Sequence, residues 1–244
     1  MSLILATQAP GEPEIFASVQ GEGASAGMPV AFLRLSRCNL ACVWCDTPYT
    51  WHFDGDEREH RGHTTFDRTA NQLTLEPADV AERIAALGQR RLVITGGEPL
   101  MQAGKLAEML EHLPDMQVEI ETNGTVMPPA RLDIRVDQYN VSPKLSHSGN
   151  AAQLALKPDM LEHWAAEPRA FLKFVVASPA DVDEVTTLVE RHRVPRQRVF
   201  LMPEGTDSGT LRSRMDWLAP LCLETGYRLT DRLHIHLFGD TRGT

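Results

Sequence analysis

Residues 30–50, VAFLRLSRCNLACVWCDTPYT, join a β-rich apolar run to three closely spaced cysteines, Cys38, Cys42 and Cys45. The cysteines have the spacing Cys-x3-Cys-x2-Cys, and thiolate ligands favour iron–sulfur clusters or zinc. Three thiolates without a nearby fourth ligand can hold a four-iron cluster and leave one iron open to a bound molecule. The segment therefore predicts a metal centre in the loop that follows a strand.

A zinc site is the alternative interpretation of the three cysteines. Structural zinc sites are closed by four ligands. Cys222 lies far along the chain, on the expected buried face of a helix, so His52, His60 and His63 are the residues that could complete such a site. A disulfide is less favoured, because no secretory signal peptide is visible at the N-terminus and cytosolic proteins keep their thiols reduced. We therefore expect a cytoplasmic protein with an iron–sulfur cluster ahead of zinc.

The composition is that of an ordinary globular protein: 244 residues, 42% hydrophobic and 23% charged, with a net charge of −9. No apolar run approaches the roughly 20 residues of a membrane span. An acidic chain without a basic stripe argues against a general nucleic-acid surface and suits an enzyme of small molecules. We expect a single domain over residues 1–244, with a polar insertion at about 51–75 on its surface. That insertion is interpreted as a solvated loop, and a substrate lid or a partner contact is the alternative.

Short β-rich runs alternate with helical patterns along most of the chain. The runs with strand composition are residues 30–35, 91–95, 117–121, 137–142, 171–176, 198–202 and 232–237. Apolar residues at helical spacing cover residues 77–87, 178–193 and 209–225, and Pro220 is expected to kink or end the last of these helices. Strands that alternate with helices predict βαβ units and a mostly parallel α/β sheet.

Further motifs follow the predicted strands, where the chemistry of parallel α/β folds gathers. TGGEP (95–99), ETNG (121–124) and SPK (142–144) each stand at a strand end. The two glycines of TGGEP allow the backbone to approach a ligand closely, and Glu98 can accept hydrogen bonds from an amine. Trp44 precedes the last cysteine, where its ring could stack on an adenine.

The cysteine triad, Trp44 and TGGEP together resemble the radical S-adenosylmethionine (SAM) superfamily. That resemblance implies a partial (β/α)6 barrel with mostly parallel strands. It also implies that the open iron of a 4Fe-4S cluster binds the amino and carboxylate groups of SAM. An electron from the cluster then generates a 5′-deoxyadenosyl radical, which abstracts a hydrogen atom from the substrate.

Motifs from about residue 14 to about residue 240 narrow the resemblance to the 7-carboxy-7-deazaguanine synthase (QueE) family. They are VQGEG (19–23), CDTPYT (45–50), ETNG, VSPK (141–144) and LMPEG (201–205). The family's reaction is a lyase reaction of queuosine-type 7-deazapurine biosynthesis. It contracts the ring of 6-carboxy-5,6,7,8-tetrahydropterin to 7-carboxy-7-deazaguanine and releases ammonia. The resemblance further implies Mg2+, a reductant protein such as a flavodoxin and a homodimer, without direct contact to nucleic acid or membrane.

The same resemblance assigns roles residue by residue. Cys38, Cys42 and Cys45 would hold the 4Fe-4S cluster, and Thr47 would give an oxygen to Mg2+. The substrate would be bound by Val19, Gln20, Gly21, Glu22, Arg34 and Thr95, with the Arg34 guanidinium suited to a carboxylate. SAM would be bound by Gly97, Glu121, Asn123, Ser142, Pro143, Lys144, Met202, Pro203, Glu204 and Gly205.

Two features depart from some relatives. The cysteine spacing is the short one of the superfamily, whereas some family members carry a long insertion between the first two cysteines. In some relatives a proline region at the C-terminus contacts the substrate. The matching position in this chain lies near Asp240, and no role is assigned to it. His234 and His236 alternate with apolar residues in the predicted last strand, and both are interpreted as structural histidines, with a pocket-facing histidine as the alternative.

Two other classes of protein share part of the pattern. A glycyl-radical enzyme activase would have the same cysteine spacing, but it acts on a protein backbone and has no use for a loop such as VQGEG. An iron–sulfur electron carrier, a redox sensor or a zinc-stabilised module would not be an enzyme, and a carrier normally closes all its iron sites with cysteine.

Overall fold

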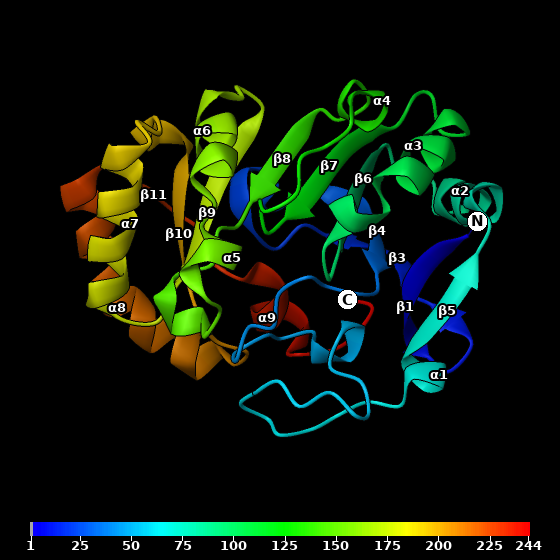
Figure 1. Ribbon diagram of the computed structural model, residues 1–244, viewed down its shortest axis with the longest axis horizontal. Helices are drawn as coiled ribbons and strands as arrows, with labels where there is room; N and C mark the ends of the chain where they lie inside the picture. The colour runs from blue at the N-terminus through cyan, green and yellow to red at the C-terminus, as the bar shows by residue number, and fades with distance from the viewer. Residues whose placement is uncertain (1) are drawn as a thin grey trace.

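The computed structural model describes residues 2–244, which form an eleven-stranded sheet with helices on its outer face (Figure 1). The central strands lie side by side and run parallel in the order β4, β6, β7, β8, β9, β10. Their bounds are Pro29–Leu35, Arg91–Gly96, Gln117–Thr122, Gln138–Val141, Ala170–Val176 and Val199–Pro203. This arrangement agrees with the mostly parallel α/β sheet that the sequence pattern predicts and with the partial (β/α)6 barrel that the family resemblance implies.

Both edges of the parallel series carry short strands that the sequence patterns do not predict. β1 (Leu3–Ala9) pairs antiparallel with β2 (Glu12–Pro13), β4 and β5 (Gln72–Leu75), and β3 (Ile15–Val19) pairs antiparallel with β4. At the other edge β11 (Arg228–Leu229) pairs parallel with β10. Three strands therefore precede the one that leads into the cysteine loop, and the VQGEG loop joins β3 to β4.

Helices follow most of the parallel strands and pack on the outside of the sheet (Figure 1). Their bounds are α1 Arg68–Asn71, α2 Pro77–Ala86, α3 Ala103–Glu111, α4 Ala130–Asp133, α5 Ala152–Ala155, α6 Pro158–Ala166, α7 Pro179–Arg191, α8 Ser208–Thr225 and α9 Leu233–Phe238. The three predicted helices are confirmed as α2, α7 and α8. In the part of the chain that the structure describes, no helix is long and apolar enough to cross a membrane.

Pro220 lies inside α8, so of the two predicted outcomes, a kink or an end of the helix, the end is wrong. A proline removes the hydrogen bond to the carbonyl group four residues earlier, here that of Asp216. Both residues are exposed, so water can satisfy the freed carbonyl oxygen on the solvent side of the helix.

The prediction of a strand at residues 232–237 is wrong, because the segment forms α9. Histidine and aliphatic residues alternate there as they do in a half-buried strand. However, only Ile235 of the helix is buried, while Leu237 and Phe238 are exposed. The segment packs beside the VQGEG loop, with the Leu233 amide donating to the Gly21 carbonyl oxygen at 3.0 Å. The segment therefore packs against a loop, and no neighbouring strand is available to pair with it.

The predicted insertion begins and ends in ordered structure. Trp51, His52 and Phe53 are buried, and the last residues form α1 and β5. Between them, residues 54–66 form the long, mostly exposed loop at the lower edge of Figure 1. In that view the arrowheads of β7 and β8 point toward this loop, so it lies on the side of the carboxyl ends of the parallel strands.

The core lies between the sheet and the outer helices, and it reaches up to the loops at the strand ends. Trp164 and Tyr139 are fully buried and their rings lie 5.0 Å apart. The Trp164 indole N–H donates to the carbonyl oxygen of Gly124 at 2.9 Å, in the ETNG loop. Gly124 has a φ of +79° and a side chain there would meet Val141, so this turn requires glycine. Core packing thus fixes the position of a loop that carries predicted site residues.

Candidate active site

A cavity of about 230 Å³ lies at the carboxyl ends of the parallel strands. Its walls come from the VQGEG loop, the cysteine loop, the ends of β6 to β10 and the C-terminal segment. Every residue that the family resemblance assigns to the site lines this cavity, except Pro143 and Pro203. Segments that are far apart in the chain therefore present one shared set of side chains.

The three cysteines of the triad are free thiols that line this cavity. The Asn150 side-chain amide donates to Cys42 Sγ at 3.3 Å, and that of Asn123 lies 3.9 Å from Cys38 Sγ. Burial raises the pKa of Cys38 to about 12 and that of Cys45 to about 11. A buried thiol loses its proton only when positive charge compensates the thiolate, and iron bound by all three would supply that charge.

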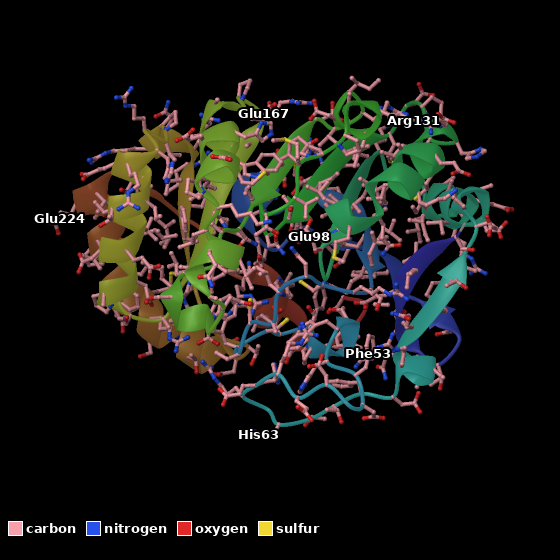
Figure 2. The ribbon with its side chains drawn as sticks, in the orientation of Figure 1. Phe53, His63, Glu98, Arg131, Glu167 and Glu224 are labelled. Atoms are coloured by element: carbon pink, nitrogen blue, oxygen red, sulfur yellow. The ribbon has the colours of Figure 1, made fainter. Side chains whose placement is uncertain are left out.

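The zinc alternative finds no support in the geometry. Among residues 2–244, no group of three or more His, Cys, Asp or Glu side chains is placed to hold a single metal ion. His52 Nδ1 lies 2.9 Å from the Thr64 carbonyl oxygen, and His60 Nε2 lies 2.8 Å from that of Cys45. His63 is exposed at the outer edge of the 54–66 loop (Figure 2). None of the three histidines therefore joins the cysteines in a four-ligand zinc site.

The TGGEP loop runs against the cysteine loop so closely that it requires glycine. A Cβ atom on Gly97 would lie 2.0 Å from the Arg37 carbonyl oxygen. The amide of Gly97 donates to the Leu35 carbonyl oxygen at 3.1 Å, and that of Glu98 donates to Arg37 at 2.9 Å. Backbone without side chains therefore stands at the cavity wall beside the cysteines, where a ligand can approach it closely.

Glu98 does not face the cavity, contrary to the expectation that it meets an amine. It is fully buried and accepts hydrogen bonds from the Thr122 hydroxyl at 2.8 Å and the amides of Asn123 and Leu100 at 2.7 and 3.0 Å. Figure 2 shows it in the middle of the molecule. Its carboxylate joins the TGGEP loop to the ETNG loop, so its role is to position both.

Trp44 lies in the cavity wall with one unexplained polar atom. Its ring stacks on His147, with centroids 5.4 Å apart and planes at 15°, and Lys144 Nζ lies 5.8 Å from its centroid. The indole Nε1 is buried, and none of the described residues accepts its hydrogen bond. Buried donors are rarely left without a partner, so the site fits a ligand that accepts a hydrogen bond here.

A second group of side chains surrounds Arg34. Its Nε donates to Glu14 Oε1 at 2.7 Å, and the Tyr49 hydroxyl donates to the same carboxylate at 3.0 Å. Phe16 and Phe32 stack with centroids 5.1 Å apart, and both line the cavity. The arrangement gives an oriented cation beside an apolar wall.

Glu121 lies among the residues assigned to the substrate. Its carboxylate accepts from the Thr95 hydroxyl at 2.7 Å and from Gln20 Nε2 at 3.1 Å. The sequence resemblance assigns Glu121 to SAM, but its neighbours in the structure are the two residues it assigns to the pterin.

Three buried charged side chains and one partly exposed carboxylate form a network beside the VQGEG loop. Glu22 pairs with Lys173 and with Arg232, whose guanidinium also pairs with Asp46. Burial alone would raise the pKa of Glu22, but Lys173 and Arg232 outweigh it and hold that pKa far below its usual value. His234 Nε2 lies 3.9 Å from Glu22, and its ring lines the cavity, so the pocket-facing alternative is correct for this histidine.

His236 lies outside the cavity, with Nδ1 3.0 Å from Ser208 Oγ and Nε2 3.0 Å from Asp231 Oδ2. It is a structural histidine, as predicted.

The LMPEG loop supplies the wall next to β10. The Glu204 carboxylate accepts from Arg61 at 3.1 Å and from Arg214 at 2.5 Å. Arg61 belongs to the exposed loop of residues 54–66, and its amide donates to the Val43 carbonyl oxygen at 2.7 Å. This loop thus contacts both the cysteine loop and the LMPEG loop.

Several cavity residues have no assignment from the sequence. Among them are Glu14, Tyr49, Asp46, Lys173 and Arg232, together with the C-terminal residues Gly239 to Arg242. One signal was available for Lys173, a single charge inside the apolar run FLKFVV. Arg232 was hidden by the wrong prediction of a strand at 232–237.

Comparisons with known proteins agree with the geometry. The family model described as radical SAM superfamily matches residues 33–143. A 7-carboxy-7-deazaguanine synthase from Pyrobaculum aerophilum is 38% identical over 234 residues, which cover 94% of this chain and 95% of that protein. Proteins of the same name from Halobacterium salinarum and Rhodopirellula baltica are 35% and 33% identical, covering 95% of this chain and 91% and 87% of theirs.

Solved structures show the same likeness. The crystal structure of QueE from Escherichia coli matches with a TM-score of 0.66 and 26% identity, covering 96% of this chain and 95% of that one. Streptococcus suis SuiB matches with a TM-score of 0.52 at 11% identity, covering 83% of this chain and 47% of that one, which is a likeness of fold alone.

Proposed function

Since the chain belongs to the 7-carboxy-7-deazaguanine synthase family of the radical SAM superfamily, we propose that its cavity converts 6-carboxy-5,6,7,8-tetrahydropterin to 7-carboxy-7-deazaguanine and ammonia. One observation carries this proposal. The three cysteines, the glycine backbone of TGGEP and the group Gln20, Thr95 and Glu121 all line a single cavity. Cofactor and substrate would therefore lie within reach of each other.

The residues present fit a 4Fe-4S cluster and SAM. Cys38, Cys42 and Cys45 supply the donor set, Gly97 supplies unobstructed backbone, and the free N–H of Trp44 requires an acceptor. When bound, the cluster and SAM supply the reductive radical chemistry that removes a hydrogen atom from the substrate. The protein's part is to place that hydrogen atom close to the reacting group and to exclude water, and such orientation accounts for a large share of enzymatic rates.

Arg34 would bind the carboxylate of the substrate. Glu14 orients its guanidinium through Nε, which leaves the two terminal nitrogens for a bidentate contact. Tyr49 holds Glu14 in turn. The stacked Phe16 and Phe32 give a flat ring an apolar surface nearby.

The opposite edge of the pterin carries N–H donors and would meet Glu121, which we assign to the substrate. Thr95 and Gln20 already hold the Glu121 carboxylate by hydrogen bonds, so it is oriented before the ligand arrives. Val19, Gly21 and Glu22 complete the same loop beside it.

SAM would lie along the ends of β6, β7, β8 and β10. We assign to it Gly97, Asn123, Ser142, Lys144, Met202, Glu204 and Gly205, which all line the cavity. Pro143 and Pro203 do not line it, and their part is to fix the backbone of their loops. Lys144 Nζ donates to Ser142 Oγ at 2.8 Å, so the two side chains can bind a polar ligand together.

Further properties follow from family membership as proposals. Thr47, whose hydroxyl lines the cavity 3.7 Å from Cys45 Sγ, would bind Mg2+, a cation that prefers oxygen ligands. A reductant protein such as a flavodoxin would supply the electron. We further propose a cytoplasmic homodimer in which each chain is a single domain with a surface insertion at about 51–75, with no direct contact to nucleic acid or membrane.

An anaerobic product assay tests the function. The reconstituted protein is incubated with SAM, Mg2+, dithionite and the carboxytetrahydropterin, and product is identified by mass spectrometry. We expect 7-carboxy-7-deazaguanine, together with a change in the electron paramagnetic resonance spectrum of the reduced cluster when SAM is added. A SAM-dependent spectrum without deazaguanine would reject the substrate, and an unchanged spectrum would reject the radical SAM site.

A further inference from the structure

We propose that Arg232 is a positioning residue that holds the substrate loop, the cysteine loop and the SAM loop in one fixed arrangement. In these three loops Arg232 contacts Glu22, Asp46 and Gly205, respectively. The proposal rests on the proposed function, because that function decides which ligand each loop serves. Arg232 is proposed to act through the loops that it contacts, and no contact with the reacting atoms is assigned to it.

Each nitrogen of the Arg232 guanidinium donates a hydrogen bond to a different loop. Nε donates to Glu22 Oε1 at 3.0 Å, and Nη1 donates to the Gly205 carbonyl oxygen at 2.6 Å. Nη2 donates to Asp46 Oδ2. Asp46 stands between Cys45, a predicted cluster ligand, and Thr47, the predicted magnesium ligand. A single planar group therefore joins the surroundings of substrate, metal and SAM.

The Arg232 guanidinium is buried, and its removal affects its two carboxylate partners differently. Arg232 is 6% exposed, and the paired charges around it are Glu22, Lys173 and Asp46. Without Arg232, Glu22 would keep Lys173, whereas Asp46 has no other ion pair in the described part of the chain. Removing Arg232 leaves the Asp46 carboxylate, whose side chain is 35% exposed, without an ion-pair partner, so the cysteine loop should respond most.

The backbone on either side of Arg232 is held by the substrate loop and by β10. The Gly23 amide donates to Thr230 Oγ1 at 2.8 Å, and the Thr230 amide donates to the Leu201 carbonyl oxygen at 3.0 Å. A Cβ atom on Gly21 would lie 2.1 Å from His234 Nδ1. The segment from residue 230 to residue 234 is thus wedged between the substrate loop and β10, and it cannot shift without moving both.

Lysine cannot replace this arginine. A lysine ammonium is a compact charge on a flexible stem, whereas the guanidinium presents donors in a fixed planar fork. Arg232→Lys keeps the positive charge but cannot reach three acceptors that lie on three sides. The variant therefore separates the positioning role from simple charge balance.

Misplacement of a substrate by about 1 Å can cost roughly a hundredfold in rate. Radical chemistry adds a second symptom, because a radical that does not meet its substrate is quenched by another hydrogen donor. We expect Arg232→Lys to cleave SAM without forming a matching amount of deazaguanine. The ratio of product to 5′-deoxyadenosine should fall at least about tenfold, whereas a loss of folded protein alone would leave that ratio unchanged.

The test compares Arg232→Lys, Arg232→Gln and Asp46→Asn with wild type and with Arg169→Lys. Arg169 is a matched control, since it also holds several acceptors but lies far from the cavity, before β9. Three readouts are taken on the anaerobic holoprotein: the ratio of product to 5′-deoxyadenosine, the Kd of the pterin for the oxidised, non-reacting enzyme, and amide hydrogen exchange.

We expect the Arg232 variants to lower the product ratio, weaken pterin binding and speed exchange in residues 19–23, 44–48 and 204–206 together. Asp46→Asn should do so chiefly in residues 44–48, and it decides the question if the Arg232 variants do not fold. Arg169→Lys should leave the product ratio, the pterin Kd and the exchange of these three segments unchanged. Wild-type ratios and exchange in Arg232→Lys, or exchange that rises uniformly over the chain, would overturn the proposal. Absence of product from the wild type would reject the proposed function, while the exchange data would still test Arg232.

Discussion

Arg232 and Arg169 stand at opposite ends of the parallel strands and bind their neighbours by similar chemistry, but in different surroundings. Arg169 precedes β9 and donates to Glu167 and Asp133 carboxylates and to the carbonyl oxygens of Asp133 and Val136. Its side chain is 30% exposed, against 8% for Arg232. Figure 2 shows Glu167 at the edge of the molecule opposite the 54–66 loop.

The amino ends of the strands use arginine to close helix ends. Arg135 donates to the carbonyl oxygens of Leu110 and Leu113 after α3, and Arg198 donates to those of Ala165 and Glu167 after α6. The last carbonyl groups of a helix have no partner within it, and arginine near the C-terminus satisfies them. These contacts stabilise the fold, whereas the buried charges at the carboxyl ends hold loops that carry the chemistry. Changes at the carboxyl ends should therefore affect catalysis first, and changes at the amino ends should affect stability first.

The largest difference between the two ends should come from the cysteines. Cys42→Ser removes one thiolate from the predicted cluster, and a hydroxyl is a much poorer ligand for iron. We expect iron content to collapse and product to fall to the detection limit, while the thermal midpoint of the metal-free protein hardly moves. Iron analysis, the product assay and circular dichroism measure these. Cys222→Ser is the matched control, because Cys222 is also buried but belongs to α8; equal iron loss in both variants would contradict the assignment.

Arg34→Lys should have the next largest effect on catalysis, and it should affect the pterin and not SAM. The change removes the planar fork and its contact with Glu14. A hydrogen bond between charged groups is worth about 1.5–3 kcal/mol, so kcat/KM for the pterin should fall roughly tenfold to a hundredfold. Steady-state kinetics with each substrate varied in turn measures this. The KM for SAM should stay within twofold, and a parallel rise in both KM values would show that Arg34 supports the whole cavity rather than one ligand.

Gly97→Ala tests the contact between the TGGEP and cysteine loops. The new Cβ would lie 2.0 Å from the Arg37 carbonyl oxygen, in backbone that cannot rotate away. Overpacking of this kind costs about 1–3 kcal/mol, and we expect weaker SAM binding with it. Gly104 offers the control in α3, because no described atom lies within 4 Å of its Cβ position. Gly104→Ala should stabilise the protein by about 0.5–1 kcal/mol. Urea denaturation and SAM titration distinguish the two, and similar behaviour of both variants would contradict the close-contact argument.

Sequence patterns predict what is local in the chain. The parallel strands β4 and β6 to β10 have apolar runs long enough to recognise, and the motifs at their ends reach one cavity because carboxyl ends of parallel strands meet at one edge. β2, β5 and β11 were missed because two to four residues show little periodicity. β1 and β3 were not recognised although they have seven and five residues. The alternation of histidine and apolar residues in α9 resembled a strand, because alternation alone does not show whether a neighbouring strand is available to pair with the segment.

The charge network around Arg232 could not be predicted, because its contacts join residues 186 and 210 positions apart. Neither Glu22 nor Asp46 carries a local sign of its partner. Motif spacing identified both loops, but only the fold shows which arginine connects them. Long-range ion pairs are thus the part of this site where the three-dimensional structure adds most to the sequence.

The smallest expected effect lies at the amino end and depends on pH. The hydrogen bond from Arg169 lowers the pKa of Glu167 from 4.5 to about 2. The stabilisation it brings is complete above pH 4.5 and is lost as the pH falls toward 2, because the folded state must then take up a proton that the unfolded state already holds. Arg169→Gln should therefore destabilise the protein at pH 7 by less than about 1 kcal/mol, as expected for a partly exposed pair, and should flatten the loss of stability between pH 5 and pH 3. Urea denaturation at several pH values measures this slope, and the ratio of product to 5′-deoxyadenosine at pH 7 should equal that of the wild type. A changed ratio with an unchanged slope would reverse the distinction between the two ends, because it would place a catalytic function where the structure shows only the closure of helix ends.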